Sequence, residues 1–203
     1  EGKAASTVSR ALASTRSFFG WLFKEEKIRR DPADSMHAPK IEKKVPVILT
    51  VDEVTKLLEQ PSGANPKEIR DKAMLELLYA TGIRVTELVN LKLSDVNMSI
   101  GFITCRDEHK ERMIPFGHAA KDALAKYLES ARETFLKGTR SELLFTNYSG
   151  RAMSRQGFWK VLKGYAAKAG IDKDITPRMF RHSCAAHMAA GGAGLQMIQE
   201  MLG

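Results

Sequence analysis

The sequence predicts a mainly α-helical protein that carries one small antiparallel β-hairpin. Across most of the chain, apolar residues recur at helical spacing, and these stretches begin at capping residues and end at glycines. Only residues 101–116 differ, because short apolar runs there flank a charged turn, which is typical of a hairpin. An apolar content of 43% and a charged content of 28% are ordinary for a folded globular chain.

The first expected helix runs from Ser6 to Ile28 and has a strong apolar stripe. Such a helix must bury its stripe against other helices, and we expect those partners to lie upstream of this chain. Residues 1–35 are therefore interpreted as the C-terminal part of a helical domain. Residues 36–48 are polar, basic and without periodicity, which is typical of an interdomain linker, and a second domain is expected over 49–203.

The second domain opens with two helices that have clear start signals. Thr50 and Glu53 form a capping box ahead of an apolar stripe, and Asn65 with Pro66 caps a helix that ends at Gly82. A short helix follows after residue 84. The sequence thus predicts three helices before the hairpin.

Arg84 lies at the junction between two of these helices, beside an apolar core. Two interpretations are open: a structural ion pair, with Glu87 as partner, or a ligand-binding group. The charged hairpin tip over 106–112 is equally open, since it is either a solvated loop or a basic contact.

The second half of the domain returns mainly to helical spacing. One helix is expected over 117–135, a short strand at 143–145, and a helix from the Ser154 cap to Gly170. A last helix begins at Leu195, after the break at 191–192.

The stretch from Thr176 to Ser183 carries the strongest candidate site. Thr176 and Pro177 start a helix that places Arg178, Arg181 and His182 on one face. Two guanidinium forks near a helix N-terminus can bind a phosphodiester. The alternative is a solvated basic face.

Charge and composition narrow the class of partner. The chain has 32 Lys and Arg against 24 Asp and Glu, a net charge of +8, which favours a polyanion: nucleic acid first and an anionic membrane surface second. No apolar run approaches the roughly 18 residues of a spanning helix and no signal peptide is apparent, so we expect a cytoplasmic protein without a membrane partner. Cys105 and Cys184 are expected to be reduced and packed.

No nucleotide-binding loop, dinucleotide fingerprint or zinc motif is present in the sequence, so no metal and no cofactor is expected. What remains is a set of cationic side chains. Such groups can hold the non-bridging oxygens of a phosphoryl-transfer transition state, provided that a nucleophile and a general acid are also supplied.

Several runs together carry a resemblance to a known family. They are YATGIRVTELVNL at 79–91, SDV at 94–96, HKERMIP at 109–115, LFT at 144–146, RHS at 181–183 and QEMLG at 199–203. In these runs the chain resembles the tyrosine recombinase (phage integrase) family, and the Xer type in particular. The similarity covers nearly the whole chain.

The resemblance implies a fold and an activity. The fold would be a tyrosine recombinase catalytic domain with part of a helical core-binding domain, together forming a clamp around duplex DNA. Members of the family cleave and rejoin DNA strands through a 3′-phosphotyrosine, without metal or ATP. Four protomers act on two DNA sites, and a second recombinase or an accessory protein is a further partner to expect.

The resemblance also assigns residues. Arg84 and Arg181 match the two catalytic arginines, and Glu87 matches an acidic position that supports the site. Among the remaining positions, the catalytic set would include Lys110 and Arg178, and DNA contacts would come from Arg106, Arg112, Ser154, Arg155, Gln156 and His182.

The sequence departs from the family pattern in three places. Arg178 stands where the family usually has a histidine, and arginine is a poor proton acceptor. An ungapped count puts Asp107 at the position of the hairpin lysine, so Lys110 is only the best available substitute. The nucleophile normally follows the segment that matches 199–203, and no tyrosine of this chain lies there. We therefore expect a fragment that lacks the nucleophile segment and is inactive as given.

Three functions remain open from the sequence. The first is a site-specific DNA recombinase or integrase. The second is a catalytically inactive, recombinase-like DNA-binding protein, and the third is a type IB topoisomerase-like activity.

Overall fold

The computed structural model describes residues 2–41, 45–106 and 111–203. The chain divides into two compact units, Glu1–Val45 and Pro46–Gly203. The boundary between the units falls inside residues 36–48, which were predicted from the sequence to be a linker. The identity of each domain stays a prediction.

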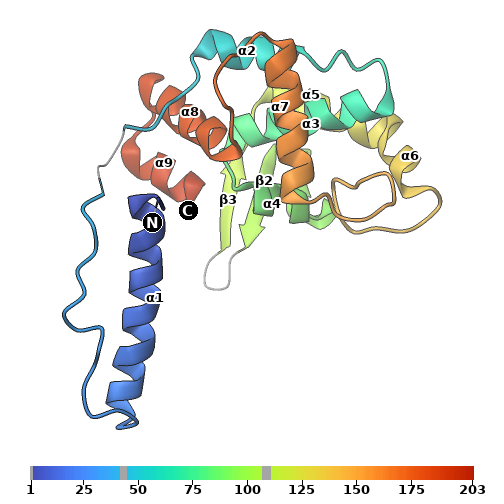
Figure 1. The fold of residues 1–203 in the computed structure, drawn as a ribbon. Coiled ribbons are helices and arrows are strands. Elements are labelled where there is room, and N and C mark those ends of the chain that lie inside the picture. Colours follow the sequence, from blue (N-terminus) through green and yellow to red (C-terminus); the bar gives the residue numbers. More distant parts are fainter. Residues whose placement is uncertain (1, 42–44, 107–110) are drawn as a thin grey trace. The chain divides into compact units, whose positions relative to one another are not determined.

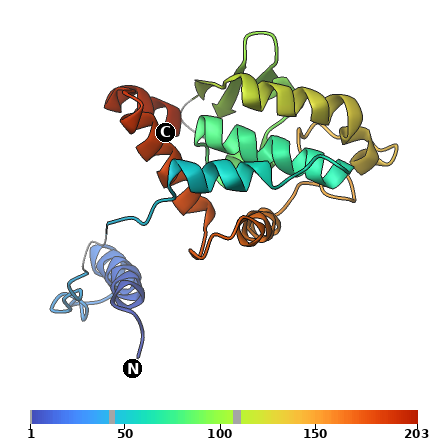
Figure 2. The same ribbon diagram turned by 90° about the horizontal axis from the view of Figure 1, so that it is seen from above.

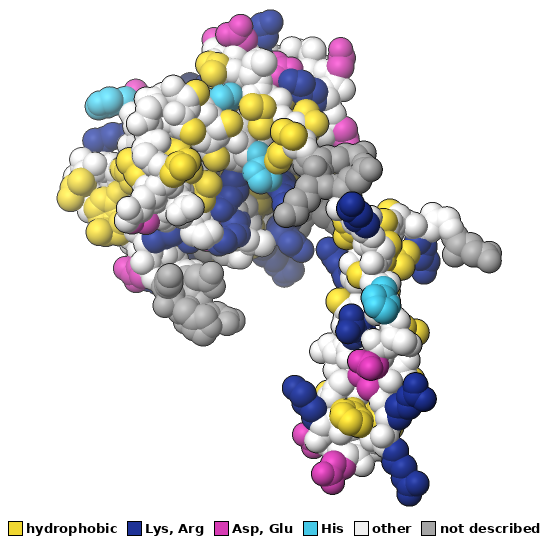
Figure 3. All heavy atoms as spheres, turned by 90° about the vertical axis from the view of Figure 1, so that its left-hand side faces the viewer, with side chains coloured by type: hydrophobic (Ala, Val, Ile, Leu, Met, Phe, Trp, Pro, Cys, Tyr) yellow, Lys and Arg dark blue, Asp and Glu magenta, His cyan; other side chains and the backbone are white. Residues whose placement is uncertain are grey.

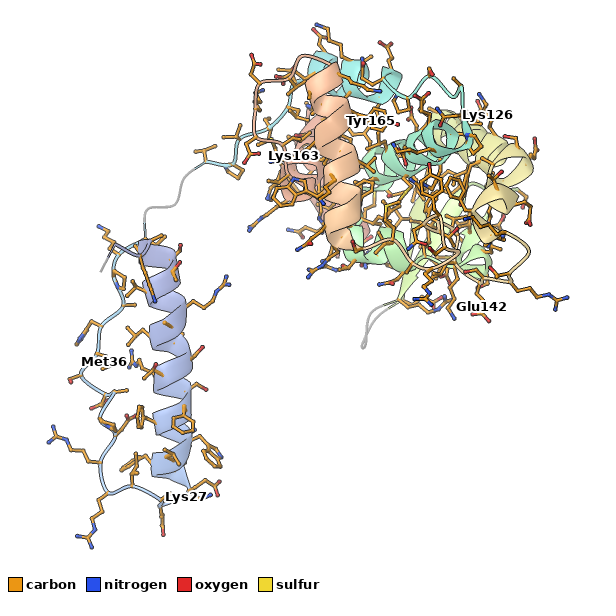
Figure 4. All side chains as sticks on the ribbon, turned by 45° about the vertical axis from the view of Figure 1, so that its right-hand side comes forward. Lys27, Met36, Lys126, Glu142, Lys163 and Tyr165 are labelled. Atoms are coloured by element: carbon orange, nitrogen blue, oxygen red, sulfur yellow. The ribbon has the colours of Figure 1, made fainter. Side chains whose placement is uncertain are left out.

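The first unit is built on α1 (Ala5–Lys24), which ends before the predicted Ile28. The chain leaves the helix through Glu26, whose φ of 55° is left-handed, and then runs back beside α1 past Met36 (Figures 1 and 4). No residue of α1 is buried, and Phe18 and Trp21 are 56% and 48% exposed. The apolar stripe seen in the sequence is thus uncovered within this unit.

The second unit begins with the two predicted capped helices. In α2 (Val51–Glu59), Glu53 N–H donates to Thr50 Oγ1 and Thr50 N–H donates to the Glu53 carboxylate, which confirms the capping box. Asn65 caps α3 (Pro66–Thr81), and Gly82 ends it in the left-handed region at φ 61°. These start and stop signals therefore act as the sequence predicts.

The hairpin is confirmed and gains a third strand. After α4 (Val85–Asn90) and a short 3₁₀ turn, the sheet consists of β1 (Val96–Asn97), β2 (Phe102–Arg106) and β3 (Glu111–Pro115). The strands are antiparallel in the order β1-β2-β3, with Ile103 opposite Ile114 and Cys105 opposite Arg112. The sequence did not predict β1, because two residues are too few to show alternation.

Two predictions for the next segment are wrong. The expected helix over 117–135 is divided into α5 (His118–Ser130) and α6 (Arg132–Leu136) at Ala131, where φ is −123°. The expected strand at 143–145 is only an isolated bridge between Lys92 and Leu143. Leu144 and Phe145 are apolar because they are fully buried, and an apolar run that fills a core need not pair as a strand.

Three helices complete the unit: α7 (Arg155–Lys168), α8 (Pro177–Ala190) and α9 (Leu195–Leu202). Ser154 and Thr176 are confirmed as N-caps, since they accept from the N–H groups of Gly157 and Met179. The free cysteines at 105 and 184 are buried, as expected.

The core of this unit lies around α3, whose Leu75, Leu77 and Leu78 are fully buried. Helix α3 packs against α5 and α8, while α9 packs against α8 and β3 (Figure 2). Within the described residues, no helix is both long and apolar enough to cross a membrane.

The chain enters this core at Leu49, which is fully buried and attached to α8 through both backbone groups. Its N–H donates to Ser183 Oγ at 2.8 Å, and its carbonyl accepts from His187 Nε2 at 3.0 Å. Tyr79 Oη donates to the other ring nitrogen of His187 at 2.9 Å. The segment that follows the predicted linker is therefore fixed directly to α8.

Candidate active site

One cavity of about 740 Å³ brings together six of the residues predicted for the site. Arg84 comes from the start of α4, the residues at 155 and 156 from the start of α7, and those at 178, 181 and 182 from α8. These segments are far apart in the sequence. The fold thus brings residues of α4 and α7 together with the cationic face of α8, which was the only part of the cluster that helical spacing predicted.

The cavity is strongly cationic. Its described lining includes four arginines, Arg84, Arg155, Arg178 and Arg181, and neither aspartate nor glutamate. Lys and Arg side chains also gather in a band on the face of the larger unit drawn in Figure 3. Such a surface attracts an anion and repels no part of a phosphodiester.

Arg84 makes the ion pair with Glu87, which confirms the first interpretation; it also lines the cavity, and its binding of a ligand stays a prediction. Its backbone N–H donates to Glu87 Oε2 at 2.7 Å, and its Nη1 lies 3.3 Å from Oε1. Its Nη2 donates to the Gly203 carbonyl at 2.7 Å. The side chain is still 44% exposed, so it can reach a ligand.

Arg181 is held more tightly and keeps one donor group without a partner. Its Nη2 donates to the Leu202 carbonyl at 2.6 Å, while its buried Nη1 has no hydrogen-bond partner among the described residues. Burial, followed by the charge of Arg84, lowers the pKa of Arg181. An unpartnered buried N–H is costly, and an anion in the cavity would relieve this cost.

Arg178 and His182 are joined on the exposed edge of α8. Arg178 Nε donates to His182 Nε2 at 3.2 Å, and neither Nη group of Arg178 is bonded within the part of the chain that the structure describes. Burial and the charges of Arg178 and Arg181 lower the pKa of His182. The imidazole is therefore neutral near pH 7 and acts as an acceptor for Arg178.

The start of α7 contributes exposed groups. Arg155 and Gln156 line the cavity, but Ser154 does not, because its hydroxyl oxygen serves as the helix cap. Trp159 also lines the cavity and donates from Nε1 to the Ile175 carbonyl at 2.8 Å. Trp159 was not predicted from the sequence, although its i, i+4 spacing from Arg155 places both on one helix face.

Arg106 and Arg112, the predicted hairpin residues that the structure describes, do not line this cavity. Arg106 is paired with Asp95 and with Glu111, and Arg112 is paired with Glu87. Lys110 and the neighbouring Asp107 lie outside the described residues.

None of the four tyrosines lies among the described residues that line the cavity. Tyr127 donates to the Leu144 carbonyl and Tyr165 donates to Asp71, while Tyr148 is 54% exposed against Phe135. With Tyr79 bonded to His187, each tyrosine therefore has a structural contact with residues that do not line the cavity.

Known proteins resemble this chain along its full length. The signature of the Phage integrase family matches residues 48–203. Tyrosine recombinase XerD of Halalkalibacterium halodurans is 46% identical over 204 residues, which cover 100% of this chain and 68% of that protein. A putative tyrosine recombinase of Caldanaerobacter subterraneus is 45% identical and is covered to 69%.

Solved structures agree in fold. XerA recombinase matches with a TM-score of 0.70 and 28% identity, over 90% of this chain and 63% of that one. XerH recombinase, bound to its palindromic difH substrate, matches with a TM-score of 0.84 and 22% identity, over 99% of this chain and 61% of that one. This chain thus spans about three fifths of these solved recombinases.

The fold class predicted from the sequence, a helical protein with a small antiparallel sheet and a tyrosine recombinase catalytic domain, is confirmed by these structures. With a family match over most of the chain and relatives of 46% identity, the protein belongs to the phage integrase family of tyrosine recombinases, and its curated relatives include the Xer type.

Proposed function

We propose that this chain is the catalytic part of a site-specific DNA recombinase that cleaves and rejoins strands through a 3′-phosphotyrosine. The observation that carries the proposal is the meeting of Arg84 and Arg181 in one cavity, where a buried Nη1 of Arg181 lacks a partner among the described residues. The names of the relatives and the DNA bound by the XerH structure support it.

The chemistry follows from the charge of the cavity. Two guanidinium groups can each donate to the non-bridging oxygens of the scissile phosphate and stabilise the charge that grows in the transition state. Arg178 adds a third cation at the exposed edge, where no described residue accepts from its two Nη groups. The phosphodiester is the expected occupant because it offers one charge and two such oxygens.

The other predicted residues surround this phosphate in the proposal. Arg155, Gln156 and Ser154 at the start of α7 would contact the DNA backbone near the cavity. His182 and the hairpin arginine Arg106 would extend these contacts, and Lys110 would serve as general acid toward the leaving oxygen.

The assembly is also part of the proposal. Four protomers would act on two duplex sites, with a second recombinase or an accessory protein as a further partner. No metal or nucleotide takes part, because the covalent phosphotyrosine conserves the energy of the cleaved bond.

A second function is a DNA-binding protein that does not cut. Arg178 favours it, since a guanidinium cannot take up a proton at the position where the family has a histidine. Both functions require the cationic cavity and differ only in cleavage.

The binding test uses duplexes selected from a random library by the protein expressed from its complete gene. Replacing Arg84 or Arg181 by Ala should weaken binding about tenfold or more and reduce the dependence of log K on log salt by about one. Lys126→Ala is the matched control, because it removes the same charge from the exposed surface of α5, away from the cavity lining (Figure 4). Equal effects of all three variants would contradict a phosphate site in the cavity.

The cleavage test uses the same protein with a nicked suicide duplex that carries the selected site. A recombinase should form a covalent protein–DNA adduct that survives denaturation and disappears in the Arg181→Ala variant. Tight, salt-dependent binding without any adduct would instead establish the non-cleaving function.

A further inference from the structure

Arg112 is the most enclosed of the arginines that the sequence assigned to DNA. Its side chain is only 14% exposed, and it does not line the cationic cavity among the described residues. Its Nη2 donates to both carboxylate oxygens of Glu87, at 2.8 and 2.9 Å, and its Nε donates to the Met201 carbonyl at 3.1 Å. Three of the five N–H groups of this guanidinium are thus directed at the protein itself.

Glu87, the partner of Arg112, is the group that fixes Arg84. Its carboxylate accepts from the backbone N–H of Arg84 at 2.7 Å and contacts the Arg84 guanidinium at 3.3 Å. The Glu87 side chain is itself 14% exposed, so its charge needs a close counter-ion. Arg112 supplies that counter-ion from strand β3 and donates to the same two carboxylate oxygens that Arg84 contacts.

The end of α9 is the third feature held by Arg112. The carbonyls of Met201, Leu202 and Gly203 accept in turn from Arg112, Arg181 and Arg84. Positive groups at a helix C-terminus are favourable because the helix dipole is negative there. The three arginines thus share one anchor.

Gly203 shows how closely Arg112 approaches this end. Its φ is 73°, and a Cβ added there would lie 2.8 Å from Arg112 Cζ. The guanidinium therefore packs directly on the backbone that also receives Arg84. A residue in this position links the sheet, the Arg84 motif and α9.

We propose that Arg112 is a positioning residue, which holds Glu87 and the end of α9 so that Arg84 is aligned for phosphate binding, and does not contact DNA itself. The link from Arg112 to Arg84 is a property of the protein alone. Its effect on DNA rests on the function proposed above.

The first test therefore needs no DNA. In Arg112→Lys and Arg112→Met, the backbone amide of Arg84 should exchange with deuterium about tenfold faster, because Glu87 loses the fork that holds it. The amide of Thr50 is the matched control, since it donates to Glu53 in a separate capping box. Unchanged exchange at Arg84 in both variants would overturn the proposal, and the methionine variant retains the test if the lysine variant fails to fold.

The second test is a double-mutant cycle on affinity for the selected duplex. Arg84→Ala and Arg112→Lys should each weaken binding, and the double variant should bind within about twofold of Arg84→Ala alone, because Arg112 acts through Arg84. The comparison pair, Arg84→Ala with Arg155→Ala, should show multiplied losses, since Arg155 is an independent exposed cation.

The outcomes separate the two proposals. Multiplied losses for Arg84 and Arg112, or full rescue by Lys at 112, would mean that Arg112 is a direct charge contact and would overturn the positioning role. If the wild-type protein binds no duplex, the proposed function fails, and the exchange rate of the Arg84 amide still decides the role of Arg112.

Discussion

The cationic residues of α8 differ in burial and in hydrogen bonding. Within the described residues, Arg181 is half-buried with an unpartnered Nη1, whereas Arg178 is exposed and donates to His182 alone. His182 lines the same cavity as Arg84 and Arg155. Its protonation would add a fifth positive charge to this lining.

His182 should therefore make the protein sensitive to acid. Burial and the charges of Arg178 and Arg181 lower its pKa below the ordinary 6.5, so the unfolded chain binds this proton more readily than the folded protein. Stability from His182 is complete above the ordinary pKa and is lost as pH falls through the lowered value. The fall in Tm between pH 7.5 and pH 5 should be smaller in His182→Gln than in the wild type.

Gln is the suitable replacement because it keeps an acceptor for Arg178 without gaining a charge. The other histidines are present in both proteins, so their effect cancels in the comparison. An equal fall in Tm in the two proteins would show that His182 carries no such linkage.

At this scale the sequence predicted much of the site. Helical spacing placed Arg178, Arg181 and His182 on one face, and they do line one cavity. Spacing could not connect Arg84 with them, because their meeting depends on tertiary packing; the family resemblance supplied that connection. The pairing of Arg106 with Asp95 also depends on the fold, since one residue lies on β2 and the other before β1.

At the level of helices and strands, the sequence predicted helix boundaries that depend on neighbouring residues. It did not predict boundaries that depend on tertiary packing. Thr50, Asn65 and Thr176 cap their helices through bonds to residues three positions on, which sequence spacing encodes. The break at Ala131 has no glycine or proline to announce it. It reflects the packing of α6, where the buried Arg132 donates to the carbonyls of Ser141 and Leu143.

Gly82, which ends α3, should be sensitive to replacement by a larger residue. Gly82 has φ 61°, and a Cβ there would lie 2.7 Å from Leu202 Cδ2 and 3.2 Å from Cys184 Sγ. Gly82→Ala should therefore add a steric cost, of about 1 kcal/mol or more, to the strain of a left-handed alanine. Denaturant unfolding measures the difference.

Gly138→Ala is the matched control for strain alone. Gly138 has φ 81°, and a Cβ there would meet nothing within 4 Å. Equal losses of unfolding free energy in the two variants would mean that α9 yields freely to the added methyl group.

At the scale of the whole second unit, a buried ionic network connects α3 with α7 and with the segment at Thr146. Asp71 is fully buried and accepts from Lys67, Arg70 and Tyr165, and Arg70 also donates to the Thr146 carbonyl. Burial and Asp71 together raise the pKa of Tyr165, which lies on α7 (Figure 4). Three parts of the fold therefore depend on one carboxylate.

Asp71→Asn should lower the free energy of unfolding by about 3–5 kcal/mol, because it leaves the buried Arg70 without its counter-ion. Glu142→Gln breaks an exposed pair with Lys92 and should change it by less than about 1 kcal/mol. Urea unfolding of both variants checks the contrast, and a small effect of Asp71→Asn would refute the structural role of the network.

Because Leu49 is attached to α8, mutations in the codons of this helix should fall into two phenotypic classes. The side chains of Arg178, Arg181 and His182 line the cavity. Those of Ser183 and His187 bond to the backbone of Leu49, where the chain enters the core of the second unit. Substitutions within this one helix should thus divide by helical phase into those that alter the cavity and those that release Leu49 from α8. A genetic screen of ten codons would read out both functions of a single helix.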